Sequence, residues 1–185
     1  MSQSELTGNY VAVDTETTGL NCMQNEIIEV GAVRFRNWEP VAEFNTLIRP
    51  RCHIPYNITC LTGISDAMVA GKPRFAEIID DLMSFIGDDD IVGHNVCFDL
   101  GFLSHGGAPV YTSGNQSVDT VRLARRLLKK GTDVENHSLG TMCRYYDIIN
   151  ENAHRACDDA RAAGILYKCL METAAQQKAG PQADS

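Results

Sequence analysis

Hydrophobic residues in the first third of the chain form short runs that are typical of β-strands. Residues 10–13, 26–36 and 42–48 are rich in β-branched and aromatic side chains. The Thr-Thr-Gly at 17–19 has the composition of a turn, and residues 37–40 separate the second run from the third. Because consecutive strand-like runs joined by short turns usually pair with each other, we predict an antiparallel meander over this part of the chain.

Beyond residue 70 the hydrophobic spacing changes to that of helices. Between residues 50 and 63, two prolines and a glycine predict an irregular stretch. One amphipathic helix then follows from apolar residues at three- and four-residue intervals, which are Phe75, Ile78, Ile79, Leu82 and Phe85 or Ile86. Residues 90–93 predict a short buried strand, and Asn95 is a suitable cap for the next helix, which runs through Leu103.

Three further helices are expected: residues 118–130, a short helix from the cap Asn136 to Tyr145, and residues 155–171. Three strands followed by alternating strands and helices indicate an α/β fold. Its mixed central sheet would begin as an antiparallel meander, continue with parallel strands and be flanked by α-helices. We expect an N-terminal extension over residues 1–8, one domain over 9–173 and a flexible tail over 174–185.

Composition favours a cytoplasmic protein. No stretch approaches the roughly 20 apolar residues of a membrane span, so no membrane partner is expected. The N-terminus lacks the basic and apolar regions of a signal peptide. The cysteines, seven in all, are odd in number and scattered, as expected of reduced thiols, and we predict no disulfides.

The formal charge of −8 argues against a protein that coats nucleic acid, because nonspecific binding uses an excess of Lys and Arg against phosphates. A protein that takes in only a strand end needs fewer phosphate contacts, and bound cations would neutralise part of the acidic charge. The net charge is therefore compatible with an enzyme that acts on the ends of nucleic acid strands.

The candidate chemistry lies in four carboxylates and one imidazole: Asp14, Glu16, Asp99, His154 and Asp159. In a strand, alternate side chains share a face, so the first two would project together while the threonine between them points away. Carboxylates held this close repel one another unless a cation binds or one stays protonated. The set is sufficient to hold two divalent cations and activate a water against a phosphodiester.

Three fragments resemble the DEDDh, or DnaQ-like, 3′→5′ exonucleases, which include polymerase proofreading subunits, oligoribonucleases and RNase T. They are Val-Asp-Thr-Glu-Thr-Thr-Gly-Leu at 13–20, Gly-His-Asn-Val-Cys-Phe-Asp at 93–99 and His-Arg-Ala-Cys-Asp-Asp-Ala at 154–160. Their order and spacing match, and the resemblance extends from about residue 9 to residue 170. It implies a ribonuclease H-like fold and the histidine rather than the tyrosine variant of the family.

The resemblance also implies the site residues. Asp14, Glu16, Asp99 and Asp159 would bind two divalent cations, Mg²⁺ or Mn²⁺. His154 would be the base near the attacking water, because an imidazole ordinarily titrates near neutral pH. Asp158 is a rival for the last ligand, but the family spacing selects Asp159. The expected substrate-binding residues are Thr15, Thr17, Leu20, Ile64, Asn95 and Phe98.

Other polar residues have a structural interpretation. Asp119 is typical of a helix start, and His94 and His137 are more often hydrogen-bonded structural residues than ligands. The Cys and His residues within 52–60 lack the second half of a zinc site. The basic residues at 125–130 would form a solvated helix face, with phosphate contact as the alternative.

The leading functional hypothesis is an exonuclease that releases 5′-mononucleotides from single-stranded or frayed DNA 3′ ends. An exoribonuclease that trims RNA 3′ ends uses the same chemistry and is the first alternative. A noncatalytic module that binds nucleic acid or a polymerase is the second. Expected partners are the strand ends themselves and a DNA polymerase or another replication or repair protein.

Overall fold

The computed structural model describes residues 8–179. Residues 1–7, which form nearly all of the predicted N-terminal extension, and residues 180–185 of the predicted tail lie outside the described part. Residues 174–179, the first part of that predicted tail, continue the last helix.

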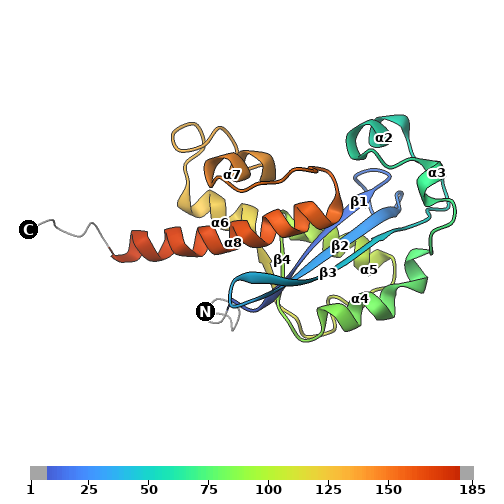
Figure 1. Ribbon diagram of the computed structural model, residues 1–185, viewed down its shortest axis with the longest axis horizontal. Helices are drawn as coiled ribbons and strands as arrows, with labels where there is room; N and C mark the ends of the chain where they lie inside the picture. The colour runs from blue at the N-terminus through green and yellow to red at the C-terminus, as the bar shows by residue number, and fades with distance from the viewer. Residues whose placement is uncertain (1–7, 180–185) are drawn as a thin grey trace, which may run out of the picture.

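A five-stranded mixed sheet forms the centre of the molecule, in the order β3-β2-β1-β4-β5 (Figure 1). The strands are β1 (Tyr10–Thr17), β2 (Ile27–Arg36), β3 (Glu39–Leu47), β4 (Ile91–Gly93) and β5 (Ser117–Asp119). The first three pair antiparallel, β4 pairs parallel with β1, and β5 pairs parallel with β4. The predicted meander and mixed sheet are therefore confirmed.

Helices cover both faces of the sheet. They are α2 (Tyr56–Thr62), α3 (Asp66–Val69), the 3-10 helix η1 (Phe75–Glu77), α4 (Ile79–Ile86), α5 (Val96–His105), α6 (Thr120–Leu127), α7 (Leu139–Tyr145) and α8 (Ala156–Ala179). Helix α8 lies along β1 and β2 on one face and contacts α6 and α7, while α4 and α5 lie on the other (Figure 1). The far end of α8 projects away from the sheet.

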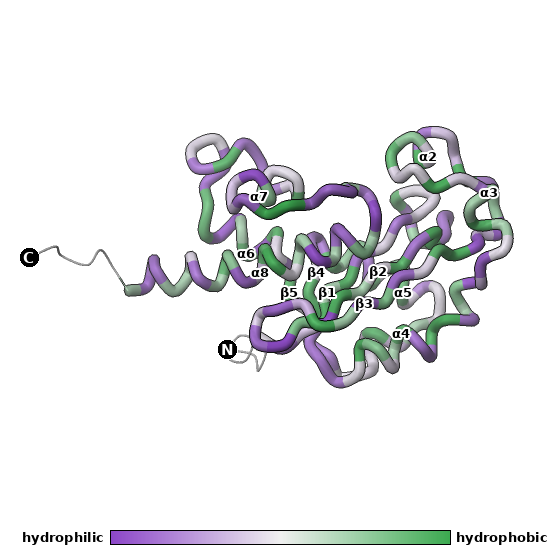
Figure 2. Tube along the Cα trace, in the orientation of Figure 1, coloured by the Kyte–Doolittle hydropathy of each residue, from purple (hydrophilic) through white to green (hydrophobic). Residues whose placement is uncertain are grey.

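Alternation along β1 divides the core between these two layers. Tyr10 and Ala12 pack in a buried cluster with Tyr167 of α8. Val11 and Val13 point to the opposite face and pack in a cluster that contains residues of α4 and α5. Figure 2 shows hydrophobic positions in the central strands and in α4 and α5, whereas the loop between α7 and α8 is largely hydrophilic. Because Asp14 and Glu16 continue the first alternation, their backbone positions place them on the α8 face.

Three details of the predicted secondary structure are wrong: the start of one helix, the cap of another and the absence of a helix after residue 50. The hydrophobic pattern predicts one helix over residues 118–130, but Val118 belongs to β5 and the helix starts only at Thr120. Asp119 is its cap, since its side chain accepts a hydrogen bond from the backbone N–H of Val121. The cap of α7 is Ser138 rather than Asn136, whose side chain instead accepts from the N–H of Ser138. The supposedly irregular stretch after residue 50 contains α2, which buries only one residue and so gives no hydrophobic repeat.

Candidate functional site

Two acidic residues lie in the second half of β1, and one comes from the helix that packs behind it. Asp99 is the fourth residue of α5 and is only 3% exposed. Its Oδ1 accepts hydrogen bonds from the backbone N–H of Thr15 at 2.9 Å and from the Thr15 hydroxyl at 2.8 Å. These bonds fix the Asp99 carboxylate against β1, beside the strand residue that separates Asp14 from Glu16.

The loop before α8 and the first turn of that helix bring the other two residues. Asp159 is the fourth residue of α8. Its Oδ2 accepts a hydrogen bond from the backbone N–H of His154 at 3.0 Å, and its Oδ1 accepts one from the side-chain amide of Asn150 at 2.6 Å. His154 is exposed and has a left-handed backbone with φ of 67°. The loop is therefore folded back onto the carboxylate of Asp159.

The side chains converge as a cluster. Ligand atoms of Glu16, His154 and Asp159 all lie within 4.8 Å of one another, and they form the one such group of acidic, histidine or cysteine residues in residues 8–179. The negative charges of Asp99, Asp159 and Glu16 raise the pKa of the Asp14 carboxyl group. The structure thus brings Glu16, His154 and Asp159 together, and it places Asp14 and Asp99 near enough for their charges to act on the same carboxyl groups.

Burial and mutual repulsion raise the pKa values of these carboxyl groups. Burial raises the pKa of Glu16 to about 7, with further contributions from Asp159 and Glu29. Burial also raises the pKa of Asp99 to about 7, although its bonds to Thr15 act in the opposite direction. The pKa of Asp14 rises well above its ordinary value for the same reason. Four ionised carboxylates cannot share this site without a compensating positive charge.

The donor set fits hard divalent cations. Carboxylate oxygens are the ligands that Mg²⁺ and Mn²⁺ prefer, and the cluster supplies them from β1, α5 and α8 at a desolvated position. The elevated pKa values show the cost of this arrangement without cations. A bound cation would remove that cost by favouring the ionised forms.

An ion pair between a buried carboxylate and a partly exposed arginine secures the start of α8, and sequence reasoning missed it. Glu29 lies opposite Glu16 in the β1–β2 register and its side chain is 1% exposed. Its carboxylate accepts hydrogen bonds from Arg155 Nη2 at 2.7 Å and Nε at 3.1 Å, and from the backbone N–H of Ala156 at 3.1 Å. The sequence signal that could have revealed this ion pair is the charged Glu29 inside the apolar run of β2.

Close approach of α8 to β2 also requires a glycine. A Cβ atom on Gly31 would lie 2.2 Å from the backbone of Ala156 and Cys157. Any larger residue would push the first turn of α8 away from the sheet. The position of Asp159 therefore depends on a small residue in β2 and on the Glu29 carboxylate beside it.

The predicted substrate-binding residues fall into two groups. Leu20 is 88% exposed and Asn95 is exposed, while Phe98 is partly buried with its ring 4.9 Å from that of Phe102. The side chains of Thr15 and Thr17 are buried and hydrogen-bonded within the protein, Thr15 to Asp99 as described and Thr17 to Gly19. The two threonines lie in the second half of β1, and only their backbone atoms are left to contact a ligand.

The structure contradicts the prediction that Ile64 binds the substrate. Its side chain is 0% exposed and packs in a cluster with Ile28, Ile54 and Val69. It stabilises the α2–α3 segment against β2 and cannot stack on a base. Leu61, on the preceding helix, is exposed.

The residues given a structural interpretation have structural partners. The His94 ring lies 2.9 Å from the Thr120 hydroxyl and 2.9 Å from the His137 carbonyl, and burial lowers its pKa. The His137 ring lies 3.0 Å from the Leu128 carbonyl. Asp119 also accepts a hydrogen bond from the backbone N–H of Asn95. The structural interpretation of these three residues is confirmed.

The thiols and the helix lengths bear on two further expectations. All seven cysteines are free, as predicted. Within the described residues, none of the helices combines the length and the hydrophobicity that crossing a membrane requires.

Comparisons with known proteins identify the family. The exonuclease family model RNase_T matches residues 11–167. The PolC-type DNA polymerase III of Clostridium perfringens is 39% identical over 160 residues, which cover 86% of this chain and 11% of the polymerase. The Bacillus subtilis PolC-type DNA polymerase III is 35% identical over 171 residues, covering 91% of this chain and 12% of the polymerase. The chain thus spans little more than a tenth of these relatives.

Solved structures agree. Exonuclease X in complex with 5′ overhanging duplex DNA matches with a TM-score of 0.74 and 26% identity, covering 90% of this chain and 93% of that one. Escherichia coli Exonuclease I in complex with a dT13 oligonucleotide has a TM-score of 0.76 at 17% identity, over 92% of this chain and 42% of that one, and shows the shared fold alone. The chain therefore belongs to the exonuclease family, as a DnaQ-like nuclease with a ribonuclease H-like fold.

Proposed function

We propose that this protein is a 3′→5′ exonuclease that releases 5′-mononucleotides from single-stranded or frayed DNA ends. The observation that carries the proposal is the grouping of Glu16, His154 and Asp159, whose ligand atoms lie within 4.8 Å of one another. The carboxylates of Asp14 in β1 and Asp99 in α5 lie near enough to act on each other electrostatically and on the same site. In this proposal Asp14, Glu16, Asp99 and Asp159 hold two divalent cations, Mg²⁺ or Mn²⁺.

The cations, when bound, would supply charge stabilisation for the nonbridging oxygens and the leaving 3′ oxygen of an in-line displacement. His154 accepts the proton of the attacking water, and its exposed ring leaves that proton a route to solvent. The Asp159 carboxylate orients this loop by accepting the His154 N–H, and Asn150 orients Asp159. These contacts hold base and ligand in one unit.

Selection of a chain end would come from the turn after β1. Its backbone lies beside the Asp14 and Glu16 pair, where a terminal 3′-hydroxyl would have to sit. The exposed side chain of Leu20 and the ring edge of Phe98 are available for stacking on the last bases, which tolerates any sequence. Asn95 is exposed beside α5 for a polar contact.

DNA is the proposed substrate because relatives similar over most of this chain are DNA polymerases and because the similar exonuclease X structure contains duplex DNA with a 5′ overhang. A polymerase or another replication or repair protein is the proposed partner on the same grounds. Among the described residues, no feature of the site favours RNA over DNA, and the experiment below compares the two substrates.

The test is digestion of matched DNA and RNA oligonucleotides labelled at the 5′ end, with Mg²⁺, Mn²⁺, Ca²⁺ or EDTA. A ladder that shortens one nucleotide at a time, in Mg²⁺ or Mn²⁺ only, supports the proposal. Immediate release of the 5′ label, or internal cuts, would refute the polarity. Faster cleavage of RNA than of DNA would show that RNA is the preferred substrate.

A matched pair of variants tests the ligand assignment. Asp159→Asn should abolish turnover, whereas Asp158→Asn, on the next residue of α8, should retain most of it. A helix turns about 100° per residue, so the two side chains face different directions. Normal activity of Asp159→Asn would reject the assignment.

A further inference from the structure

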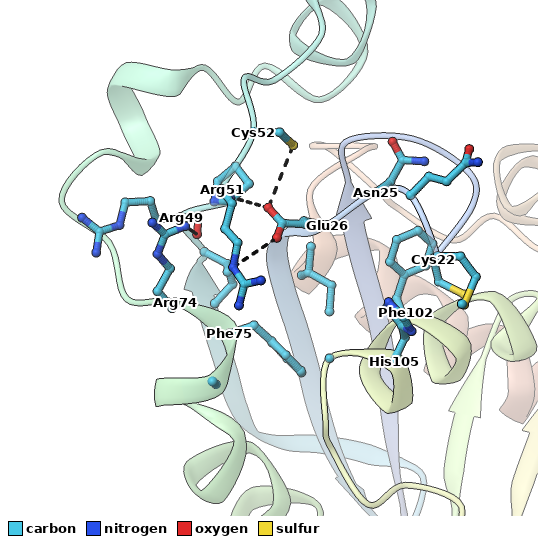
Figure 3. A pocket seen from close by; sticks show the side chains of 17 residues that line it. Cys22, Asn25, Glu26, Arg49, Arg51, Cys52, Arg74, Phe75, Phe102 and His105 are labelled. Carbon is cyan, nitrogen blue, oxygen red and sulfur yellow. Dashed lines mark hydrogen bonds and ion pairs between the residues drawn. The ribbon is translucent and has the colours of Figure 1, made fainter.

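A cavity with a volume of about 490 Å³ lies outside the carboxylate cluster (Figure 3). Four segments line it: residues 22–27 of the β1–β2 loop and the start of β2, 48–52 after β3, 74–76 at η1, and residues of the last turn of α5 through Gly106. None of the five residues of the carboxylate cluster lines this cavity. The cavity is therefore a site distinct from the carboxylate cluster.

The cavity is basic in a chain of formal charge −8. Arg49, Arg51 and Arg74 line it together with one carboxylate, Glu26. Glu26 pairs with Arg51, whose side chain is 85% exposed, at the long distance of 3.8 Å. Among residues 8–179 the other two arginines form no ion pair with a carboxylate. Positive charge is thus left over for an anionic ligand.

The orientation of two of these arginines is set by the backbone. Arg49 Nη1 donates to the Ala70 carbonyl at 3.3 Å, and Arg74 Nη1 donates to the Arg49 carbonyl at 3.2 Å. Each bond uses one N–H of a guanidinium that has five, so the remaining donors are available to a planar or tetrahedral oxyanion. Arginine forks suit phosphate in particular.

Aromatic and aliphatic side chains form the rest of the wall. Phe75 and Phe102 line the cavity together with Ile27 and Ile48. Figure 3 shows the Phe75 ring on the cavity side of η1, below the arginines. The ring packs tightly on Gly106, where a Cβ atom would lie 2.4 Å from it. Arginine combined with an apolar, partly aromatic surface is the composition of subsites that bind single-stranded nucleic acid.

The cavity connects to the carboxylate cluster through two shared elements. Phe102 is one turn along α5 from Phe98, whose ring it contacts and which precedes Asp99. The β1–β2 loop begins directly after the strand of Asp14 and Glu16 and ends in the cavity wall. The cavity and the cluster therefore share α5 and the β1–β2 segment, and a strand whose 3′ end lies at the cluster can follow these elements toward the cavity.

We propose that this cavity binds the phosphates and a base of the single strand upstream of the terminal nucleotide. The inference rests on the proposed function, because it places the 3′ end at the carboxylate cluster. The charge selects a polyanion, and the apolar wall selects a polyanion with stacking bases over a simple acidic chain.

The experiment compares two double variants that remove the same charge. Arg49→Gln with Arg51→Gln alters the cavity, and Arg122→Gln with Arg126→Gln alters exposed positions on α6. Binding of fluorescent single-stranded DNA of two to eight nucleotides is measured in EDTA at several salt concentrations. Arg51→Gln alone is the second variant, since its exposed side chain can change without unfolding the protein.

The expected result is a loss of affinity for the longer strands only in the cavity variants. Each lost phosphate contact lowers the slope of log K against log salt by about 0.7, so the double variant should lose about 1.4. Turnover in Mg²⁺ of a nitrophenyl ester of thymidine 5′-monophosphate, a phosphodiester with no upstream nucleotide, should be unchanged, which separates this inference from the exonuclease reaction itself. If neither the wild type nor any variant degrades any strand, the proposed function fails instead.

Three outcomes would overturn the inference. One is an equal loss of DNA affinity in the α6 variant, which would indicate general electrostatics. Another is unchanged affinity of the cavity variants for every length. The third is binding of polyglutamate, lost in the cavity variants, with DNA binding intact, which would assign the cavity to an acidic protein partner.

Discussion

Without divalent cations, the protein should become less stable as the pH rises from 5 to 8. In the folded state the pKa of Glu16 lies near 7 instead of 4.5, and burial is the largest cause. Between these values the unfolded chain has released the proton while the folded chain still holds it. Because the unfolded state then binds fewer protons, raising the pH favours unfolding across this window. The pKa of Asp99 is raised in the same direction.

The magnitude follows from the Glu16 pKa. Each pKa unit corresponds to about 1.4 kcal/mol, so a rise from 4.5 to about 7 corresponds to about 3 kcal/mol. Glu16 is only partly buried, and solvent screening reduces the expected contribution to about 2 kcal/mol. Asp14 and Asp99 titrate with it, so the three contributions do not add.

The assay is urea unfolding in EDTA at pH 5, 6.5 and 8. Other groups also titrate here, so the measured quantity is the difference between the wild type and Glu16→Gln, which cannot ionise at this position. Between pH 5 and 8 the wild type should lose about 2 kcal/mol more than this variant. Glu135→Gln, at an exposed position, should follow the wild type. Saturating Mg²⁺ should restore stability at pH 8 in proportion to its binding.

Two results would refute this reasoning. If Glu16→Gln showed the same pH dependence as the wild type, the carboxylate would not be desolvated in the folded protein. If the wild type became more stable toward pH 8 relative to Glu16→Gln, the sign would be wrong and Glu16 would have a cationic partner in the absence of metal.

Three further variants test the parts around the cluster. Arg155→Met should destabilise the protein by about 3 kcal/mol, because it leaves the Glu29 carboxylate buried without its partner, and adding Glu29→Gln should recover most of the loss; a double-mutant cycle in urea with no coupling would contradict this. His154→Ala should lower turnover by about 10² to 10⁴ while leaving stability intact, and an unchanged pH–rate profile would remove the proposed base. Asn150→Ala should weaken Mg²⁺ affinity by about 10- to 100-fold through the lost bond to Asp159, and calorimetry showing unchanged affinity would contradict it.

The acidic cluster was predictable because its members depend on local geometry. Asp14 and Glu16 share a face through strand alternation, and Asp99 and Asp159 were recognised by their spacing within short fragments. Glu29 and Asn150 support these residues from segments that carry no such fragment. Their roles depend on which strand pairs with β1 and on how the loop before α8 folds back, and neither follows from local sequence.

Fold prediction failed where tertiary contacts overrode local pattern. Val118 continues a helical pattern in sequence, but pairing with β4 places it in a strand, and Asp119 delays the helix start. Ile64 lies within the range over which the chain resembles the family but outside the three fragments, and its apolar side chain is equally compatible with a surface and with a core. Only the position of α2 over β2 decides that it is buried.

The starts of α5 and α8 have the same design, which links the fold to the chemistry. Asn95 immediately precedes α5 with φ of 72°, His154 lies two residues before α8 with φ of 67°, and each helix carries an Asp at its fourth position. Left-handed backbone at non-glycine residues costs about 1 to 3 kcal/mol each and persists where the surroundings impose it. The positive end of a helix dipole favours the ionised carboxylate, whereas burial opposes it. The protein therefore holds strained loops beside carboxylates whose ionisation is incomplete without cations, and the proposed binding of cations would complete that ionisation at positions already fixed by the fold.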